Sequence, residues 1–358
     1  MGYLRLILAL LVLLSHAGWR VAGLNPGVAA VIGFYLISGY VMAALVRAHY
    51  NVPQRIQWFY ADRLLRLAPQ YLLYAALGAL LWVWLRAQAA PGAPSFTPFL
   101  KNDPSSMDWF NNLLVVPLNY YMVNGSDQFA LVPPAWSLGA ELQFYLLAPV
   151  MLLWPRVGVV LALTTLGVHA MALMHWIHTD WFGYRLIPGV LWVFALGMLL
   201  FAWQRSRPLW AHALALAAPL LALGVYLLLR RHGLHAAPFH QEVLLGWGLG
   251  VPLVHWLGLV GMQSRMPKDE TRNSARLHRR ANALSGDASY GVFLNHFLLI
   301  WCAQAAGWQP DVSQPGNAGH VGLVLLACAS VPLAVASQRY VETPMLILRR
   351  RIRAVHLT

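Results

Sequence analysis

Long apolar runs constrain this chain more than any other feature. About ten windows of roughly twenty residues are apolar enough to cross the hydrocarbon core of a bilayer. They begin near Leu4, Val28, Tyr71, Trp136, Val157, Pro188, Leu209, Val243, Ala288 and Gly319. Hydrophobic residues make up 59% of the chain and charged residues only 10%, which is outside the range of soluble proteins. Because lipid offers an open backbone no hydrogen-bond partners and the runs do not alternate, we predict an all-α, polytopic transmembrane helical bundle.

The distribution of basic residues predicts the orientation of these helices. A formal net charge of +13 would suit a nucleic-acid-binding protein. The positions of the charges along the chain therefore have to show whether the basic excess serves nucleic acid or the membrane. If the N-terminus is cytoplasmic and each run crosses once, 19 of the 25 Lys and Arg residues lie at cytoplasmic ends. The six others are Arg20, Arg86, Lys101, Arg185, Arg230 and Arg231. The positive-inside rule and anionic lipid explain the basic excess, so we predict two cytoplasmic termini, a multi-pass protein of the cell inner membrane, and no nucleic-acid partner.

The first apolar run admits a second interpretation. Arg5, the short apolar stretch from Leu6 to Leu14 and the segment Ser15-His16-Ala17-Gly18 also resemble a cleavable signal peptide. Charge bias does not decide between the two interpretations, because cleavage would leave the later helices oriented the same way.

Most connections between the runs are short. Longer ones are expected at residues 47–69, 88–134, 263–284 and 308–317. In the second, which we place outside, several prolines oppose regular helix, while Pro133 and Pro134 stand where a new helix would begin. We find no repeat that relates one half of the chain to the other, so we expect a single membrane domain over residues 1–358 and no separate soluble domain.

The two cysteines do not indicate redox or metal chemistry. Cys302 and Cys328 both lie in apolar runs and form neither a metal-ligand pattern nor a disulfide pattern. We therefore expect no metal cofactor.

Arg5 and His16 are the first candidate site residues. They are eleven positions apart, and eleven helical steps of 100° return to within about 20° of the starting direction, so both share one helix face about 16 Å apart. This spacing would suit a ligand with anionic phosphates at one end and a reactive group at the other, which is the shape of a coenzyme A thioester. Alternatively, Arg5 is only a cytoplasmic anchor and His16 a packed residue.

A second basic pair follows in FYADRLLRLAPQY. Arg63 and Arg66 are spaced i, i+3, so they would share one face of a short cytoplasmic helix ending near Pro69 and could clamp a phosphate together. The alternative is an amphipathic helix that lies on anionic lipid.

Glu141 is a carboxylate within an apolar run, in PPAWSLGAELQFY. An ionisable group there is costly and is expected to face a cavity or a partner rather than lipid. Ser137 and Tyr145 lie four residues to either side, on the same face. Either Glu141 takes part in catalysis or it pairs with an arginine that holds the bundle together.

Two further polar residues lie in late runs. In ASYGVFLNHFLLIW, His296 lies within an apolar run that has Tyr290 near its start and Ser289 one face away, and such a histidine is more often structural. Glu342, in RYVETPMLILRRR, lies at the cytoplasmic end of the last run beside Arg339, where we expect it to cap the helix or pair locally.

Together these segments resemble the acyltransferase 3 family of integral membrane acyltransferases, which modify surface polysaccharides, lipopolysaccharide O-antigens and other acceptors. The resemblance runs through nearly the whole chain. It begins with an arginine and a histidine separated by ten residues, here Arg5 and His16, and continues with GFYLISGYVMA, which contains Ser38 and Gly39. The family's arginine-rich stretch before a proline stands here as DRLLRLAP, in which Asp62 replaces the first arginine of the usual doublet.

Three later segments extend the resemblance. WSLGAELQFY, SYGVFLNH and YVETP resemble the family's tryptophan-serine-leucine and glutamate pattern, its serine-tyrosine and histidine segment, and its terminal glutamate-proline signature. The positions of this sequence that match these family motifs are Trp136, Ser137, Glu141, Tyr145, Ser289, Tyr290, His296, Glu342 and Pro344. The resemblance also argues against signal-peptide cleavage, which would discard His16.

The resemblance implies transfer of an acyl group, expected to be acetyl, from cytoplasmic acyl-CoA to a hydroxyl of an exopolysaccharide, an O-antigen or a lipid-linked glycan. His16 would act as general base or carry the acyl group itself. Arg5, Arg63 and Arg66 would hold the CoA phosphates, and Glu141 would position an arginine or the histidine. The expected partners are the bilayer, acyl-CoA and a glycan or glycolipid acceptor, and whether a separate periplasmic protein completes the transfer stays open.

Two functions of other classes compete with this hypothesis. Intramembrane Glu and His also mark the proton-coupled pathways of transporters, so a transporter or flippase of a lipid-linked or small anionic substrate is the main alternative, although we find no repeat symmetry. A noncatalytic subunit of a polysaccharide synthesis complex would account for the helices but not for the polar residues at family positions.

Overall fold

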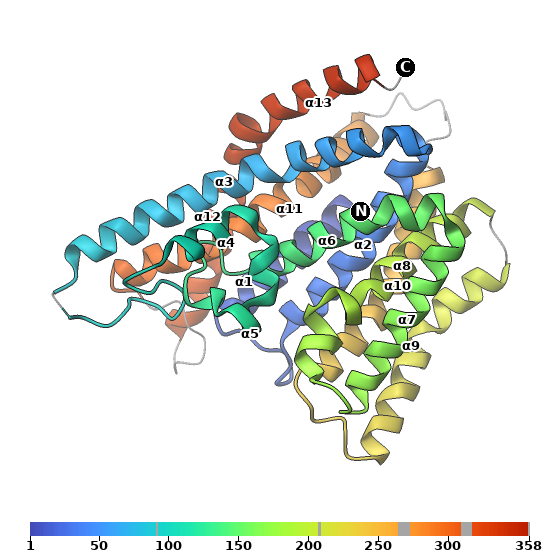
Figure 1. The fold of residues 1–358 in the computed structure, drawn as a ribbon, viewed down its shortest axis with the longest axis horizontal. Helices are drawn as coiled ribbons and strands as arrows, with labels where there is room; N and C mark the ends of the chain where they lie inside the picture. The colour runs from blue at the N-terminus through green and yellow to red at the C-terminus, as the bar shows by residue number, and fades with distance from the viewer. Residues whose placement is uncertain (91, 207–208, 264–272, 309–316, 357–358) are drawn as a thin grey trace. The chain divides into compact units, whose positions relative to one another are not determined.

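The protein is built from helices, as Figure 1 shows. In the computed structural model the described residues are 1–90, 92–206, 209–263, 273–308 and 317–356. Outside the helices, these residues form turns and two isolated β-bridges, Val21 with Leu24 and Leu100 with Phe129. The predicted all-α fold class is confirmed.

A helix is present at each of the ten predicted apolar runs. These helices are α1 (Gly2–His16), α2 (Pro26–His49), α3 (Ile56–Gln88), α6 (Ala135–Leu153), α7 (Pro155–Leu173), α8 (Ile187–Ser206), α9 (Leu209–Arg231), α10 (His240–Gln263), α11 (Asn273–Ala305) and α12 (Asn317–Ser337). The shorter elements are η1 (Pro53–Arg55), α4 (Ser106–Leu114), η2 (Val116–Tyr120), α5 (Tyr121–Asn124), η3 (Ser126–Gln128), η4 (Trp181–Arg185), η5 (Gln338–Glu342) and α13 (Thr343–His356).

Eight helical segments among the described residues are long and apolar enough to cross a membrane. They include every one of the ten helices except α1 and α11. Helix α1 has only 15 residues, and the first half of α11 carries charged side chains such as Arg279 and Arg280. The chain therefore has the helices of an integral membrane protein, while the count of ten crossings and the side of each terminus stay predictions.

Two predicted boundaries are wrong because helices run further than expected. Helix α3 does not end near Pro69 but continues through it to Gln88. A proline inside a helix removes one backbone hydrogen bond, and packing of this apolar helix against its neighbours outweighs that loss. Likewise, the predicted loop 263–284 is helical from Asn273 onward. Residues 264–272 of that loop, and 309–316 of the predicted loop 308–317, lie outside the described residues.

The predicted external loop 88–134 is folded rather than extended. It contains α4, η2, α5 and η3, and helix α6 begins at Ala135, directly after the proline pair as predicted. Asn112 ties the loop together: its side-chain amide donates to the carbonyls of Asp108 and Phe129 at 2.9 and 2.8 Å, and its Oδ1 accepts from the N–H of Leu131 at 2.9 Å. Tyr71 of α3 donates to the Asn112 carbonyl at 2.6 Å. One buried amide thereby joins two loop segments, and its backbone carbonyl anchors the loop to α3.

The described residues form two compact units, each assembled from segments far apart in the sequence. Unit 1 comprises residues 1–12, 20–60 and 144–286, and unit 2 comprises residues 13–19, 61–143 and 287–358. Helices α1, α3, α6 and α11 contribute residues to both. The single-domain prediction stays a prediction.

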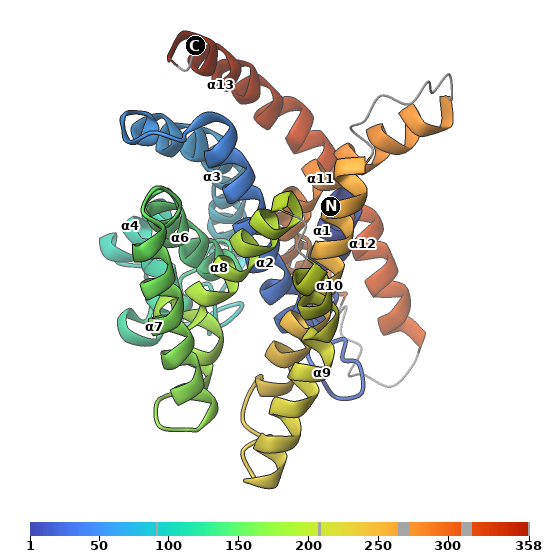
Figure 2. The ribbon, with the colours of Figure 1, turned by 90° about the vertical axis from the view of Figure 1, so that its right-hand side faces the viewer.

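In unit 1, α2 packs against α8 and α10, and α9 lies beside α10 (Figure 2). Glycines bring α2 and α8 into backbone contact. A Cβ added at Gly39 would lie 1.9 Å from the carbonyl oxygen of Phe194, and one added at Gly197 would lie 2.1 Å from that of Leu36. Beside this crossing the Phe194 ring stacks on Tyr35, with centroids 4.4 Å apart. The small residues allow the close packing that helices in a membrane need.

In unit 2, buried polar side chains connect α3, α11 and α12. Tyr74 of α3 donates to Ser337 Oγ at 2.8 Å, and the Gln70 amide donates to the same oxygen at 3.1 Å. Asn295 of α11 and Ser330 of α12 exchange two hydrogen bonds. The Asn295 side-chain N–H donates to the Ser330 carbonyl at 2.9 Å, and the Ser330 hydroxyl donates to Asn295 Oδ1 at 2.6 Å. Because buried polar groups are costly unless they are satisfied, these bonds specify which helix faces meet.

Both ends of α1 contact α11. At its beginning, the Tyr3 N–H donates to Asn282 Oδ1 at 3.2 Å, and at its end His16 Nδ1 lies 3.1 Å from His296 Nε2. Positions early in α1 thus meet positions early in α11, and later positions meet later ones. The two helices therefore run parallel.

Candidate functional site

A pair of histidines forms the centre of the candidate site. His16 is the last residue of α1 and is exposed, whereas His296 in the middle of α11 is fully buried. The Nδ1 atom of His16 lies 3.1 Å from Nε2 of His296, and the two ring planes are inclined by only 15°. The two histidines that the sequence singled out separately, 280 positions apart, are hydrogen-bonded to each other.

The geometry assigns the protons of this pair. His296 Nδ1 lies 3.2 Å from the carbonyl oxygen of Val292, which can only accept, so Nδ1 carries a proton. In neutral His296 the other nitrogen, Nε2, then has a lone pair and accepts a hydrogen bond from His16 Nδ1–H. The remaining nitrogen of His16, Nε2, is left with the lone pair. A lone pair at a fixed position is what a general base or a nucleophile requires.

Aromatic side chains pack beside the histidine pair. The ring of Phe297 lies 4.9 Å from the ring of His16 and 5.2 Å from that of His296. Phe99, from the loop before α4, packs edge-on against Phe297 at 5.4 Å. These rings give the pair an apolar neighbour, and a hydrogen bond is stronger in apolar surroundings than in water.

Arg66 of α3 forms a buried ion pair with Glu342. Glu342 is 1% exposed and belongs to η5, a π-helical turn that carries the carboxylate inward. Tyr290 adds its ring, 5.9 Å from the Arg66 guanidinium, and donates through its hydroxyl to the Leu67 carbonyl at 3.0 Å. The expectation that Glu342 pairs locally is wrong, because the π turn directs it to a helix 276 positions away in the sequence.

A second buried ion cluster forms around Asp62. Its carboxylate accepts from Arg63, the next residue, and from Arg349 of α13. Arg349 binds with two parallel hydrogen bonds, from Nε at 3.0 Å and Nη2 at 2.8 Å. Arg63 and Arg66 therefore each lie against a different carboxylate, and their proposed clamp on one phosphate stays a prediction.

The remaining predicted site residues are spread over α1, α2 and α6. In unit 2, Ser137 is buried and its hydroxyl donates to the Pro134 carbonyl at 3.0 Å, while Trp136 and Glu141 are partly buried. In unit 1, Tyr145 and Ser38 are buried and Arg5 is partly buried. Helix α1 carries Arg5 and His16 on one uninterrupted helix, as the spacing predicted.

Several members of the site were missed by sequence reasoning. They are Phe99, Phe297, Asp287 and Arg349; Asp287 lies within electrostatic range of both Arg66 and Glu342. Asp62 was noted only as a departure from the family pattern. An acidic residue inside a basic run was a usable signal for a buried counterion, but nothing in the sequence pointed to Arg349 as its partner.

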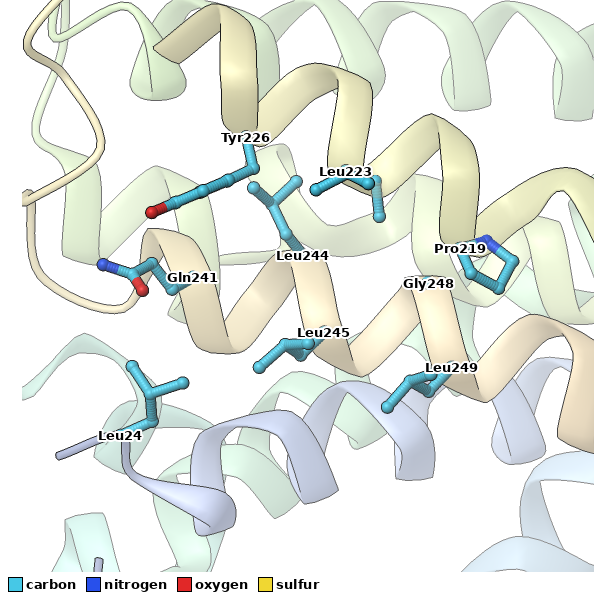
Figure 3. A pocket seen from close by; sticks show the side chains of 10 residues that line it. Leu24, Pro219, Leu223, Tyr226, Gln241, Leu244, Leu245, Gly248 and Leu249 are labelled. Atoms are coloured by element: carbon cyan, nitrogen blue, oxygen red, sulfur yellow. The ribbon is translucent and has the colours of Figure 1, made fainter. Parts of the chain in front are cut away.

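An open groove between α9 and α10 in unit 1 has a cavity volume of about 320 Å³ (Figure 3). Leu24, Pro219, Ala222, Leu223, Tyr226, Gln241, Leu244, Leu245, Gly248 and Leu249 line it. The polar side chains, Tyr226 and Gln241, lie at one end. None of the predicted site residues is among them, so this groove does not belong to the histidine site. Among the described residues, no group of three or more His, Cys, Asp or Glu side chains could hold a metal ion.

Comparison with known proteins gives three findings. The family model described as an acyltransferase domain, that of the acyltransferase 3 family, matches residues 1–339, which is nearly the full chain. An uncharacterized protein of Aquifex aeolicus is 34% identical over 176 residues, covering 48% of this chain and 71% of the relative. No solved structure matches the chain.

Proposed function

The chain belongs to the acyltransferase 3 family and is a membrane acyltransferase, and from this premise we propose that it transfers an acetyl group from cytoplasmic acyl-CoA to a hydroxyl of an envelope carbohydrate. The acceptor class is an exopolysaccharide, an O-antigen or a lipid-linked glycan, and the protein acts in the cell inner membrane. The observation that carries the chemistry is the His16–His296 hydrogen bond, which leaves the His16 Nε2 lone pair in place.

Two balanced routes use this lone pair. In the first, His16 Nε2 takes the proton of the acceptor hydroxyl while the oxygen attacks the thioester carbonyl carbon. The C–S bond then breaks, and the CoA thiolate takes the proton from His16. In the second, Nε2 itself attacks the carbonyl carbon, the C–S bond breaks and CoA leaves as the thiolate, so His16 becomes an acyl-imidazolium that keeps its Nδ1 proton. The acceptor oxygen then attacks the acyl carbon, the C–N bond breaks and the acceptor proton passes to the CoA thiolate, which restores neutral His16. In both routes the positive charge that develops on His16 is stabilised by its hydrogen bond to His296.

The basic residues of α1 and α3 support an anionic donor. Arg5, Arg63 and Arg66 supply guanidinium groups toward the predicted cytoplasmic ends of these helices, where the phosphates of CoA arrive. Arg5 stands about 16 Å from His16 along α1, a span that the extended pantetheine arm of CoA can bridge. Glu141 on α6 is proposed to position an arginine or His16, and Ser137 and Tyr145 lie four residues to either side of it on the same helix.

The experiment measures transfer and hydrolysis of [¹⁴C]acetyl-CoA by the purified protein in nanodiscs, with and without envelope glycan extract. His16→Ala is expected to lower the rate at least about a hundredfold, since a positioned general base contributes about 10²–10⁴ in rate. His296→Leu removes the acceptor of the His16 proton and is expected to lower kcat about tenfold to a hundredfold at unchanged donor KM, whereas His296→Gln keeps an acceptor oxygen and recovers part of the loss.

His320→Ala is the matched control, because His320 is an exposed histidine at the start of α12 and belongs to neither ion cluster nor the pair. Label that stays on the protein in the wild type but not in His16→Ala would identify the acyl-histidine route. Wild-type activity in His16→Ala would refute the proposed chemistry. If neither the wild type nor any variant consumes acetyl-CoA, the result would favour transport over acyl transfer.

A further inference from the structure

The face of α9 that lines the open groove of unit 1 continues to an arginine. Pro219 and Tyr226 line the groove, and Arg230 lies eleven positions after Pro219 and four after Tyr226. Eleven helical steps of about 100° return to within about 20° of the starting direction, so Arg230 belongs to the groove face, about 6 Å beyond Tyr226 along the axis. The groove face of α9 therefore passes from apolar side chains to a phenol and then to a cation.

The polar groups at this end of the groove have hydrogen-bond donors to spare. The Tyr226 hydroxyl and the Gln241 side chain lie at the same end (Figure 3). Gln241 Nε2 donates to the His235 carbonyl at 3.4 Å, which leaves its second N–H for another acceptor. Arg230 is exposed and has no ion-pair partner among the residues that the structure describes. Such donors at the end of an apolar groove suit an anionic head group.

We propose that this groove binds one acyl chain of an anionic phospholipid from the bilayer, with the phosphodiester against Arg230, Tyr226 and Gln241. Both α9 and α10 include a segment that is long and apolar enough to cross a membrane. The lining residues Leu223 and Leu249 are about half exposed, so the groove is open to a lipid from the side. Because a hydrocarbon chain packs as well against lipid as against leucine, the polar end decides which lipid binds. This inference is independent of the acyl transfer proposed above.

The charge at the polar end fits one phosphodiester. Arg230 supplies a single positive charge on the groove face, because Arg231, the next residue, is turned about 100° away. Glu242, which follows Gln241, is buried and accepts from the Asn25 N–H at 3.0 Å, so its carboxylate is directed to the start of α2. A lipid diphosphate would bring a second negative charge that no described cation on the groove face offsets, whereas a phospholipid phosphodiester brings only one.

Phospholipid binding also accounts for the position of Arg230 in the sequence. With the N-terminus in the cytoplasm, α9 would end on the external side, and Arg230 is one of the six basic residues that the positive-inside rule leaves unexplained. In this orientation the bound lipid belongs to the external leaflet.

The test measures the affinity of the first lipid bound to the detergent-purified protein, by native mass spectrometry. The wild type is expected to bind phosphatidylglycerol more tightly than phosphatidylcholine, whose choline cation offsets the attraction to Arg230. Arg230→Met is expected to weaken phosphatidylglycerol binding by about tenfold to a hundredfold, since a hydrogen bond to a charged group contributes about that factor. Arg231→Met is the matched control, because Arg231 is also exposed but lies on another face of α9, and it is expected to keep the wild-type affinity.

A second pair of variants tests the groove itself. Leu223 lines the groove and is 50% exposed, whereas Leu221 is 52% exposed and lies on the opposite face of α9. Leu223→Trp is expected to weaken phosphatidylglycerol binding about tenfold, because the indole and the acyl chain would overlap. Leu221→Trp is expected to leave the affinity unchanged. The thermal midpoints of the two variants in detergent without added lipid are expected to be equal, which separates lipid binding from folding.

Specific outcomes would overturn the inference. Equal affinity of the wild type for the two phospholipids, or equal losses in Arg230→Met and Arg231→Met, would mean that Arg230 does not select the head group. Equal losses in Leu223→Trp and Leu221→Trp would place the lipid outside the groove. A long-chain prenyl diphosphate that binds the wild type more tightly than phosphatidylglycerol, and is lost in Leu223→Trp, would assign the groove to a lipid-linked substrate instead.

Discussion

At the scale of single residues, the proton positions of the histidine pair follow from one acceptor. The Val292 carbonyl can only accept, so it determines which nitrogen of His296 is protonated, and His296 in turn determines which nitrogen of His16 is protonated. A lone imidazole would exchange between its two neutral tautomers. The backbone of α11 thereby selects the reactive atom of a residue on α1.

Asp108 is a residue whose ionisation stabilises the loop of residues 88–134, which is predicted to be external. Burial alone would raise the pKa of its carboxyl, but the Lys101 ammonium at 2.7 Å and the hydroxyl and N–H of Ser105 hold the pKa below its ordinary value. Because the folded pKa is the lower one, this stabilisation is present above the unfolded pKa of about 3.9 and is lost as the pH falls through the folded pKa.

We therefore expect the amides of α4 to lose protection from hydrogen exchange as the pH drops below about 4, beyond the intrinsic pH effect on exchange. Asp108→Asn is expected to destabilise α4 by about 1 kcal/mol at pH 7 and to abolish this acid dependence. The measurement is hydrogen exchange by mass spectrometry between pH 3 and pH 7. An acid dependence that persists in Asp108→Asn would assign it to another group.

At the scale of helices, close backbone approach decides which substitutions are tolerated. A Cβ at Gly39 would overlap the Phe194 carbonyl, so Gly39→Ala is expected to force α2 and α8 apart and to lower the thermal midpoint markedly. Gly224→Ala in α9 is the matched control, because no atom lies within 4 Å of the added methyl. Helix propensity favours alanine there by about 1 kcal/mol. Thermal unfolding in detergent checks both, and equal stability of Gly39→Ala and wild type would contradict the close crossing of α2 and α8.

Helix α3 illustrates how tertiary contacts override a local signal. Pro69 predicted a helix end, yet the residues after it contact other elements: Gln70 and Tyr74 bond to Ser337, and Tyr71 to Asn112. These contacts compensate for the hydrogen bond that the proline removes. Because the helix is continuous, the ion-paired Arg63 and Arg66 and the hydrogen-bonded Gln70, Tyr71 and Tyr74 all belong to one helix.

At the scale of the whole molecule, the parallel contact of α1 and α11 bears on the membrane topology. Seven of the candidate spans lie between these helices along the chain. An odd number of crossings returns the chain to the side on which α1 began, so α11 would cross in the same direction as α1, and α12 would return. This agrees with the charge-based prediction that both termini are cytoplasmic.

We therefore expect green fluorescent protein fused to either terminus to fluoresce in cells, and alkaline phosphatase inserted after Gly92 in the external loop to be active. Phosphatase fused to the C-terminus is the control and is expected to be inactive. An active C-terminal phosphatase fusion would mean an odd total number of crossings and would require a different direction for α12.

The sequence by itself determined the fold class, the presence of a helix at each of the ten apolar runs and the family, though not every helix boundary, because these depend on local hydropathy and on short motifs with fixed spacing. It also singled out His16 and His296. Only the tertiary structure decided that they bond to each other, that Glu342 neutralises Arg66, and that Asp62 holds Arg349. The physical reason is that spacing along a helix predicts neighbours three, four or eleven residues apart, whereas partners 276 to 287 positions apart depend on which helix faces pack together.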